Sequence, residues 1–292
     1  MGNLIYHYTS PQALLGILDS ESIWATHYAF LNDRKEMLEG CEYFMLQWRT
    51  AKEANSGADF ALLANLDSRI NELIADIKEF KRNIFIACFS KNPDSLYQWR
   101  SYCPPTGGFA IGINVKIPSS DCVTCNYEMD FKYRAYDHGI NSNQIEFQGY
   151  ESIYDPDKDH DPINIMAQPF FLSENLQNLI QGKKEAGDCT LEESFVSSVF
   201  SRKNIHFQEE NEFRFVVEIK EFRTSDKVPP IINFNGIRPY IQIPVRISNI
   251  KEIVISPQGD REQLKLFLEM LPLRFPGLKL SIKESQIPYR AV

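Results

Sequence analysis

The stretch HFQEENEFRFVVEI, residues 206–219, constrains the fold more than any other part of the chain. Its second half places apolar residues at every other position: Phe213, Phe215, Val217 and Ile219. This period of two predicts a half-buried β-strand. Because a strand directs alternate side chains to opposite faces, the other face is expected to carry Glu210, Glu212, Arg214 and Glu218. Glu210 and Glu212 would then point the same way, about 6–7 Å apart.

Two carboxylates at that separation repel each other. The pKa of one is expected to rise unless a cation or a substrate hydroxyl group offsets the repulsion. Arg214 is the candidate cation, since it follows on the same face. The spacing alone favours a simpler interpretation, in which these residues form the solvated outer face of an antiparallel strand. The rest of the chain must decide between a site and a solvated face.

Length and composition restrict the protein class. A chain of 292 residues with 43% hydrophobic residues can bury a substantial core, as one large domain or two small ones. The net charge of −8 does not favour a surface that attracts nucleic acid. No apolar run approaches the ~20 residues of a membrane span, so no membrane partner is expected. The first residues, MGNLIYHYTS, lack the features of a signal peptide, which favours a cytoplasmic location.

Metal-binding patterns are weak. Among six cysteines only Cys122 and Cys125 have CxxC spacing, and no second pair accompanies them. This disfavours a structural zinc site and predicts reduced thiols. The acidic run DPDKDHDP, residues 155–162, lacks the glycine and the closing glutamate of a calcium loop. We therefore predict no metal site.

The predicted elements do not alternate regularly between strand and helix. Strands are expected at residues 4–8, 23–26, 83–90, 109–115, 130–136, 213–219, 240–245, 250–255 and 278–283. Helices are expected at residues 10–19, 33–52, 59–81, 94–102, 173–186, 190–203 and 260–271, and a long polar loop over 137–169. This order predicts an α+β fold with a largely antiparallel sheet and inserted helices.

Four further motifs are notable: His7-Tyr-Thr9 in the first strand, Ser90 at the end of a buried strand, Trp99 to Tyr102, and Gly107-Gly108. Each has a structural explanation. The histidine could be a hydrogen-bonded core residue, the aromatic residues could fill the core, the serine could cap the next segment, and the glycines could form a turn.

Taken in order, these motifs resemble the ADP-ribosyltransferase superfamily, in its diphtheria-toxin and PARP-like His-Tyr-Glu branch. The same order is similar to a bacterial family of unknown function that opens with HYTS and carries a late ExExR strand. The resemblance covers scattered blocks of residues 4–255. It implies a single domain over 1–292 with a split antiparallel β-sheet and helical insertions at about 33–82 and 170–203.

The resemblance also implies roles for individual residues. Glu212 would be the catalytic glutamate, and Glu210 would orient or deprotonate the nucleophile. His7 would bond a ribose hydroxyl group of NAD, and Thr9 would help hold the adenosine side. Ser90 would lie near the nicotinamide ribose or support Glu212.

The residue that would stack on nicotinamide stays open among Tyr28, Phe30 and Tyr102. The expected function is NAD-dependent mono-ADP-ribosyl transfer to a nucleic-acid base or a protein side chain. The enzyme would be a bacterial toxin or anti-phage effector, and an antitoxin is a possible partner. The alternatives are a non-catalytic binding module on the same fold, and a nuclease that binds magnesium through Glu210, Glu212 and Asp33.

Overall fold

The computed structural model describes residues 3–32, 35–115, 145–151, 153–155, 176, 178–181, 191–219 and 232–289. The chain divides into two compact units. The sheet unit comprises Met1–Tyr28, Ile84–Glu151 and Gln208–Val292, and the helical unit comprises Ala29–Asn83 and Ser152–Phe207. The two predicted helical insertions, about 33–82 and 170–203, fall within the helical unit. The grouping of both units into one domain stays a prediction.

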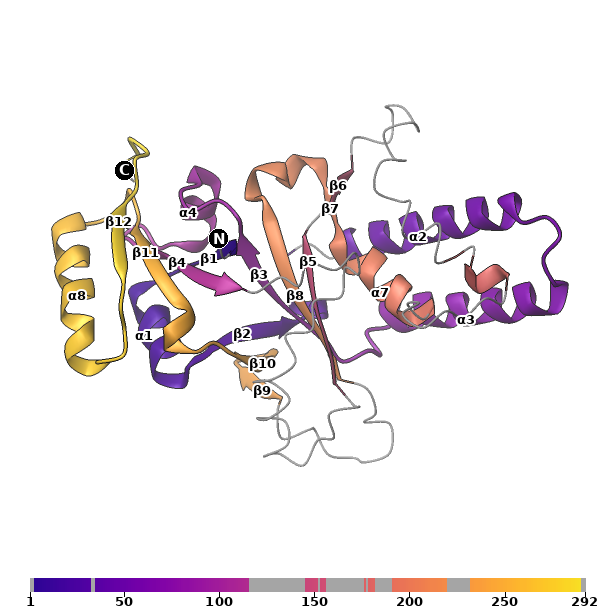
Figure 1. Cartoon of the computed structure of the whole chain (residues 1–292), viewed down its shortest axis with the longest axis horizontal. Coiled ribbons are helices and arrows are strands. Elements are labelled where there is room, and N and C mark those ends of the chain that lie inside the picture. The colour runs from indigo at the N-terminus through magenta and orange to yellow at the C-terminus, as the bar shows by residue number, and fades with distance from the viewer. Residues whose placement is uncertain are drawn as a thin grey trace. The chain divides into compact units, whose positions relative to one another are not determined.

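The sheet unit is built on a ten-stranded mixed sheet that does not close (Figure 1). Its strands are β1 (Asn3–Thr9), β2 (Ser22–His27), β3 (Ile84–Ser90), β4 (Phe109–Val115), β5 (Ile145–Glu151), β8 (Glu212–Ile219), β9 (Asn233–Asn235), β10 (Arg238–Pro244), β11 (Ile250–Ile255) and β12 (Ser281–Glu284). The order is β12-β11-β4-β1-β3-β2-β10-β9, and β8 pairs with both β3 and β5. The pairs are antiparallel except β11 with β12. This mixed, open sheet with flanking helices is compatible with the predicted α+β class.

The sheet divides at β3. Along one edge of β3, β8 pairs over the whole strand, from Ile84 opposite Glu218 to Ser90 opposite Glu212. The other edge is shared, since β1 meets it through Tyr6 opposite Ser90 and β2 meets it at the opposite end of the strand. The Ser90 end of β3 therefore lies between β1 and β8.

Three helices flank this sheet: α1 (Pro11–Ser20), α4 (Leu96–Tyr102) and α8 (Arg261–Arg274). Ser10 caps α1, because its Oγ accepts a hydrogen bond from the Ala13 amide. Helices α1 and α8 contribute their leucines to the main apolar cluster, which also contains one face of the sheet. Short 3₁₀ helices lie at η1 (Tyr28–Phe30), η4 (Ile205–Glu210) and η5 (Ile247–Asn249).

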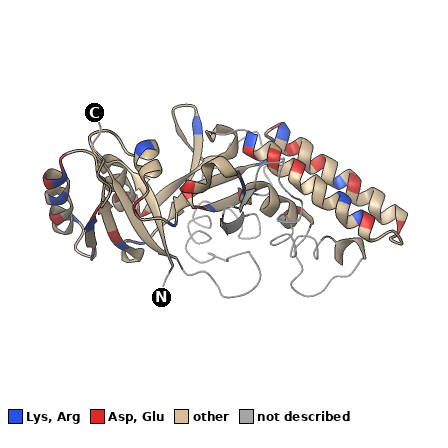
Figure 2. Cartoon of the chain, turned by 90° about the horizontal axis from the view of Figure 1, so that it is seen from above, with Lys and Arg blue, Asp and Glu red and all other residues tan. Residues whose placement is uncertain are grey.

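The helical unit contains α2 (Lys35–Ala54), α3 (Phe60–Lys78) and α7 (Leu191–Ser201), with a parallel strand pair, β6 (Ile153–Asp155) and β7 (Arg202–Asn204). Helices α2 and α3 run side by side, and charges of both signs are interspersed along them (Figure 2). The inward face of α2 buries residues at helical spacing: Met37, Cys41, Phe44 and Trp48. No helix in the described ranges is long and apolar enough to cross a membrane.

Two predictions about the middle of the chain had different outcomes. The predicted long loop over 137–169 is wrong for residues 145–151, which form β5 and pair with β8, and for 153–155, which form β6. The polarity of this segment hid the strands, because β5 carries charged and small residues among its apolar ones. The predicted strand at 130–136 and the pair Cys122 and Cys125 lie outside the described residues.

Candidate active site

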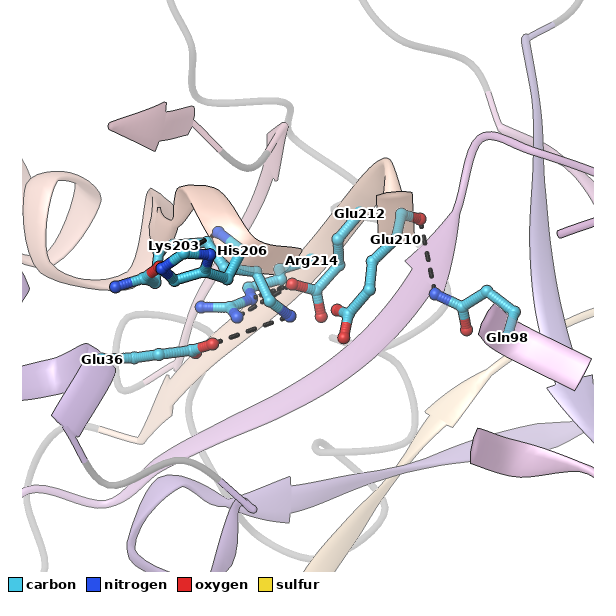
Figure 3. Close-up of polar contacts among 8 residues, drawn as sticks. Glu36, Gln98, Lys203, His206, Glu210, Glu212 and Arg214 are labelled. Carbon is cyan, nitrogen blue, oxygen red and sulfur yellow. Dashed lines mark hydrogen bonds and ion pairs between the residues drawn. The ribbon is translucent and has the colours of Figure 1, made fainter. Parts of the chain in front are cut away.

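Glu212 and Arg214 form a buried ion pair on β8 (Figure 3). Arg214 donates from Nε at 2.9 Å and from Nη2 at 2.8 Å to Glu212 Oε2. Glu212 is 4% exposed and Arg214 is 1% exposed, so the expectation of a solvated strand face is wrong. The reason is that β8 pairs on both edges and all its residues are buried. Arg214 does have the predicted role of the neighbouring cation.

The period of two predicted that Glu210 and Glu212 lie on the same strand, and this prediction is wrong for Glu210. It ends the 3₁₀ helix η4, and Asn211 between the two glutamates has a left-handed backbone, with φ of 42°. The strand begins only at Glu212. Figure 3 nevertheless shows the two carboxylates next to each other and directed to the same side. The predicted proximity of the carboxylates therefore arises from a turn and not from a strand.

Side chains from β3 and α4 hold this turn. Ser90 Oγ donates to the Glu210 carbonyl oxygen at 2.6 Å, and Gln98 Nε2 approaches the same oxygen at 3.4 Å. The Lys91 amide donates to the Asn211 carbonyl oxygen at 2.8 Å. Ser90 is also the register partner of Glu212, so it lies beside the ion pair. Gln98 was not identified from the sequence, because a single glutamine in a short helix carries no distinguishing pattern.

His7 leaves the sheet on the face opposite to Glu212. Directly paired residues of antiparallel strands point to the same face, so Tyr6, Ser90 and Glu212 form one row across β1, β3 and β8. The next residue along each strand points to the other face. There the His7 ring lies 5.6 Å from the Phe89 ring, and Nδ1 lies 3.3 Å from the Cys88 carbonyl oxygen.

This environment changes the ionisation of His7. Burial lowers the pKa of its imidazole, and the hydrogen bond with the Cys88 carbonyl only partly offsets that effect. Burial on the apolar side of the sheet therefore favours the neutral form of the imidazole. Thr9 is buried on the same strand, and its carbonyl oxygen accepts a hydrogen bond from Cys103 Sγ. The structure therefore brings Ser90, Glu210 and Glu212 together. His7 and Thr9 lie on the opposite face of the sheet.

The three aromatic candidates for nicotinamide stacking lie in different settings. Tyr28 is 1% exposed and belongs to the buried core. Phe30 belongs to the helical unit. Tyr102 ends α4, is 43% exposed, and lines an open pocket that also contains Ser10 and Gln12 from the start of α1. Only Tyr102 combines an exposed ring with a pocket.

The helical unit carries a second buried ion pair that was not identified from the sequence. Lys203 Nζ lies 3.6 Å from Glu36 Oε1, and both residues are buried (Figure 3). The neighbouring Arg202 guanidinium lies 3.4 Å from the centre of the Tyr43 ring. The only signal in the sequence is a basic pair, Arg202-Lys203, directly after a helix. Such a pair normally indicates a solvated helix end.

Metal chemistry gains no support from the described residues. They contain no group of three or more His, Cys, Asp or Glu side chains that could hold a metal ion. Asp33, which the nuclease alternative would need, lies outside the described residues. What the cluster on β8 offers is a carboxylate fixed by a guanidinium, with a second carboxylate beside it. This arrangement can stabilise positive charge on a bound molecule and accept a proton from it.

Comparison with known families places this cluster inside a matched region. The profile of a family described as "Protein of unknown function (DUF2971)" matches residues 98–215, which run from Gln98 on α4 to the residue after Arg214. No curated protein and no solved structure matches the chain.

Proposed function

We propose that this protein is an NAD-dependent mono-ADP-ribosyltransferase in which Glu212 is the catalytic carboxylate. The observation that carries the proposal is the fixed, buried carboxylate of Glu212, held by two N–H groups of Arg214 and flanked by Glu210. A carboxylate that is oriented before the reaction stabilises a developing cation without reorganising. The branching of the sheet at β3 also supports the split-sheet fold of that superfamily.

The proposed reaction requires charge stabilisation at one carbon atom. The bond between C1′ of the ribose and the nicotinamide nitrogen breaks, its electron pair leaves with nicotinamide, and C1′ becomes oxocarbenium-like. Glu212 would accept a hydrogen bond from the ribose 2′-hydroxyl group and stabilise this cation. The acceptor then forms the new bond to C1′, and its proton passes to Glu210.

The placement of His7 changes the proposed mode of binding. Because His7 and Thr9 lie on the other face of the sheet, we assign the ribose contacts to the row that contains Ser90 and Glu212. Tyr102 is the preferred stacking residue, since it is the exposed aromatic of the three candidates. The acceptor is a macromolecule, and the net charge of −8 favours a protein side chain over a nucleic-acid base. A toxin or anti-phage effector with an antitoxin partner remains our biological proposal.

The decisive experiment replaces Glu212 with glutamine, which keeps the shape of the side chain and removes its charge. We expect nicotinamide release from NAD to fall about 10²–10³-fold, or roughly 3–4 kcal/mol of barrier. The matched control is Glu218→Gln, since Glu218 lies on the same face of the same strand and is also buried. The control should keep its activity. Thermal melting of both variants, followed by circular dichroism, verifies that each is folded.

Full activity in Glu212→Gln would exclude this residue as the catalyst. The same result would favour the alternative in which Glu212 and Arg214 are a structural ion pair of a binding module. If the wild type neither binds NAD by calorimetry nor releases nicotinamide from it, the transferase proposal fails. Equal losses in Glu212→Gln and Glu218→Gln would also contradict it, because the effect would then belong to the strand and not to the carboxylate.

A further inference from the structure

The turn between the two carboxylates contains a residue in an uncommon backbone conformation. Within the described ranges, three residues other than glycine have positive φ: Glu21 at 44°, Phe80 at 54° and Asn211 at 42°. Glu21 follows the end of α1 as its C-cap, where a left-handed residue is ordinary. Asn211 instead lies between a 3₁₀ helix and a strand. A left-handed residue at such a junction requires a specific reason.

Three hydrogen bonds surround Asn211 in this conformation. The Asn211 amide donates to the Gln208 carbonyl oxygen at 3.1 Å and thereby closes the last turn of η4. One residue earlier, the Glu210 carbonyl oxygen accepts from Ser90 Oγ. The Asn211 carbonyl oxygen accepts from the Lys91 amide. The two carbonyl groups of this turn are therefore bonded by Ser90 of β3 and by Lys91, the residue after it, while the chain changes from helix to strand over one residue.

We propose that Asn211 is a positioning residue whose left-handed backbone sets the Glu210 and Glu212 carboxylates on the same side. The side chain of Asn211 is exposed, so the effect comes from its backbone. Asparagine suits the position, because it adopts the left-handed region more readily than other residues that carry a Cβ. The inference rests on the proposed function of Glu212, and it extends that function to the residue that lies between Glu210 and Glu212 in the chain.

Glycine and valine distinguish a backbone role from a side-chain role. Asn211→Gly keeps the left-handed conformation without a steric penalty, whereas Asn211→Val disfavours it strongly. We expect Asn211→Val to lower kcat for nicotinamide release about tenfold to a hundredfold, with a smaller effect on KM, and Asn211→Gly to retain wild-type kcat. The matched control is Glu21→Val, which places the same residue at another exposed left-handed position of the sheet unit. It should leave kcat unchanged.

A second measurement is independent of activity. The Lys91 amide reports the turn directly, because it donates to the Asn211 carbonyl oxygen. Its hydrogen exchange, measured by NMR on the folded protein, should be about tenfold faster in Asn211→Val than in the wild type. It should return to the wild-type rate in Asn211→Gly and should not change in Glu21→Val.

These measurements separate this inference from the proposed function. If the wild type does not act on NAD, the transferase proposal fails, and the exchange of the Lys91 amide alone decides whether Asn211 holds the turn. Unchanged exchange in Asn211→Val overturns the inference. If the wild type is active, equal kcat in the valine and glycine variants overturns it, whether both are active or both impaired.

Discussion

On one face of β8 the rings of Phe213 and Phe215 pack with Phe89, whereas on the other face Glu212 pairs with Arg214 at a similar depth. The apolar face stabilises the fold in proportion to the area it removes from water. The charged face behaves differently, because desolvation of two ions largely cancels their attraction. The two faces of β8 are thus buried to a similar degree, but a gain in stability explains the burial of the apolar face alone.

This difference separates residues that stabilise the fold from residues whose burial needs another explanation, such as a functional site. A buried phenylalanine contributes about 1.5–3 kcal/mol relative to an exposed one. A buried ion pair is often no more stabilising than apolar residues of the same volume. The pair of Glu212 and Arg214 is therefore weak support for stability and stronger support for a site.

Loss of the guanidinium should have the largest effect. Arg214→Leu is expected to lower the free energy of unfolding by about 3–5 kcal/mol, because Glu212 stays buried without the two N–H groups that held it. Phe213→Ala on the opposite face should cost a similar amount, about 3–5 kcal/mol. The two losses should respond differently to a second substitution, Glu212→Leu. Added to Arg214→Leu, it should restore most of the lost unfolding free energy, and added to Phe213→Ala it should restore none.

Urea denaturation of the single and double variants provides the measurement. The coupling between positions 212 and 214 is obtained from a double-mutant cycle. A double variant as unstable as Arg214→Leu would contradict the contrast between the faces. It would show that the stability lost with Arg214 came from its packing and not from an unpaired carboxylate.

A second polar contact lies on the sheet face that carries Glu212, and it passes over a glycine. Tyr6 on β1 donates to Glu252 on β11 at 2.9 Å, across Gly112 on the strand between them. A Cβ atom at Gly112 would lie 2.7 Å from Glu252 Cγ and 3.0 Å from Tyr6 Cε1. Gly112→Ala should therefore cost about 1–3 kcal/mol of unfolding free energy.

Gly16 on α1 supplies the control for this prediction. A Cβ atom there would meet nothing within 4 Å, so Gly16→Ala should be neutral or stabilising by up to about 1 kcal/mol. Thermal melts of both variants are sufficient to compare them. If Gly112→Ala melts like the wild type, Tyr6 and Glu252 can separate without cost, and the polar face is looser than the structure indicates.

The sequence predicted the apolar face well because hydrophobic period and capping are local signals. The strand at 250–255 was predicted at its observed bounds, and the one at 109–115 likewise. The Ser10 cap of α1 is local as well, because its hydrogen bond joins residues three positions apart. These features depend on neighbouring residues alone, so a single sequence contains them.

The polar face could not be predicted because its burial depends on segments that are distant in sequence. The alternation in 213–219 gives the side of each residue but not what covers that side. β5, from within a segment predicted as a loop, pairs with β8 and makes it an inner strand. The left-handed Asn211 was also hidden, because one residue carries no period. The resemblance implied that His7 and Glu212 both contact NAD, whereas the register of β1, β3 and β8 assigns them to opposite faces of the sheet.

His7 gives the apolar face a dependence on pH. Its pKa is lowered by burial, so the unfolded chain binds a proton at a higher pH than the folded protein does. Stability from this residue is complete above the unfolded pKa, about 6.5, and falls as the pH decreases below that value. His7→Gln should reduce the loss of urea resistance between pH 8 and pH 5.5. Equal slopes in the wild type and His7→Gln would show that the His7 environment is hydrated.

The smallest effect is expected at an exposed counterpart of the buried ion pair. Asp67 on α3 accepts hydrogen bonds from Trp48 Nε1 at 2.6 Å and from Lys52 Nζ at 2.7 Å. Burial tends to raise the pKa of Asp67, but the bonds from Lys52 and Trp48 outweigh it and the pKa is lowered. The contribution of Asp67 to the free energy of unfolding is thus present above the pKa of the unfolded chain, about 3.9, and is lost as the pH falls through the pKa of the folded protein.

Because Asp67 is partly exposed, solvent screens this pair and its contribution should stay below about 1 kcal/mol. Asp67→Asn keeps an acceptor for Trp48 and removes the charge. We expect a small loss of stability at pH 7 that disappears in 1 M salt, where charges are screened over about 3 Å. The loss in Arg214→Leu should persist in the same salt, since that pair is buried. Urea denaturation at low and high salt measures both. Salt sensitivity in Arg214→Leu equal to that in Asp67→Asn would mean that water reaches Glu212 as freely as it reaches Asp67.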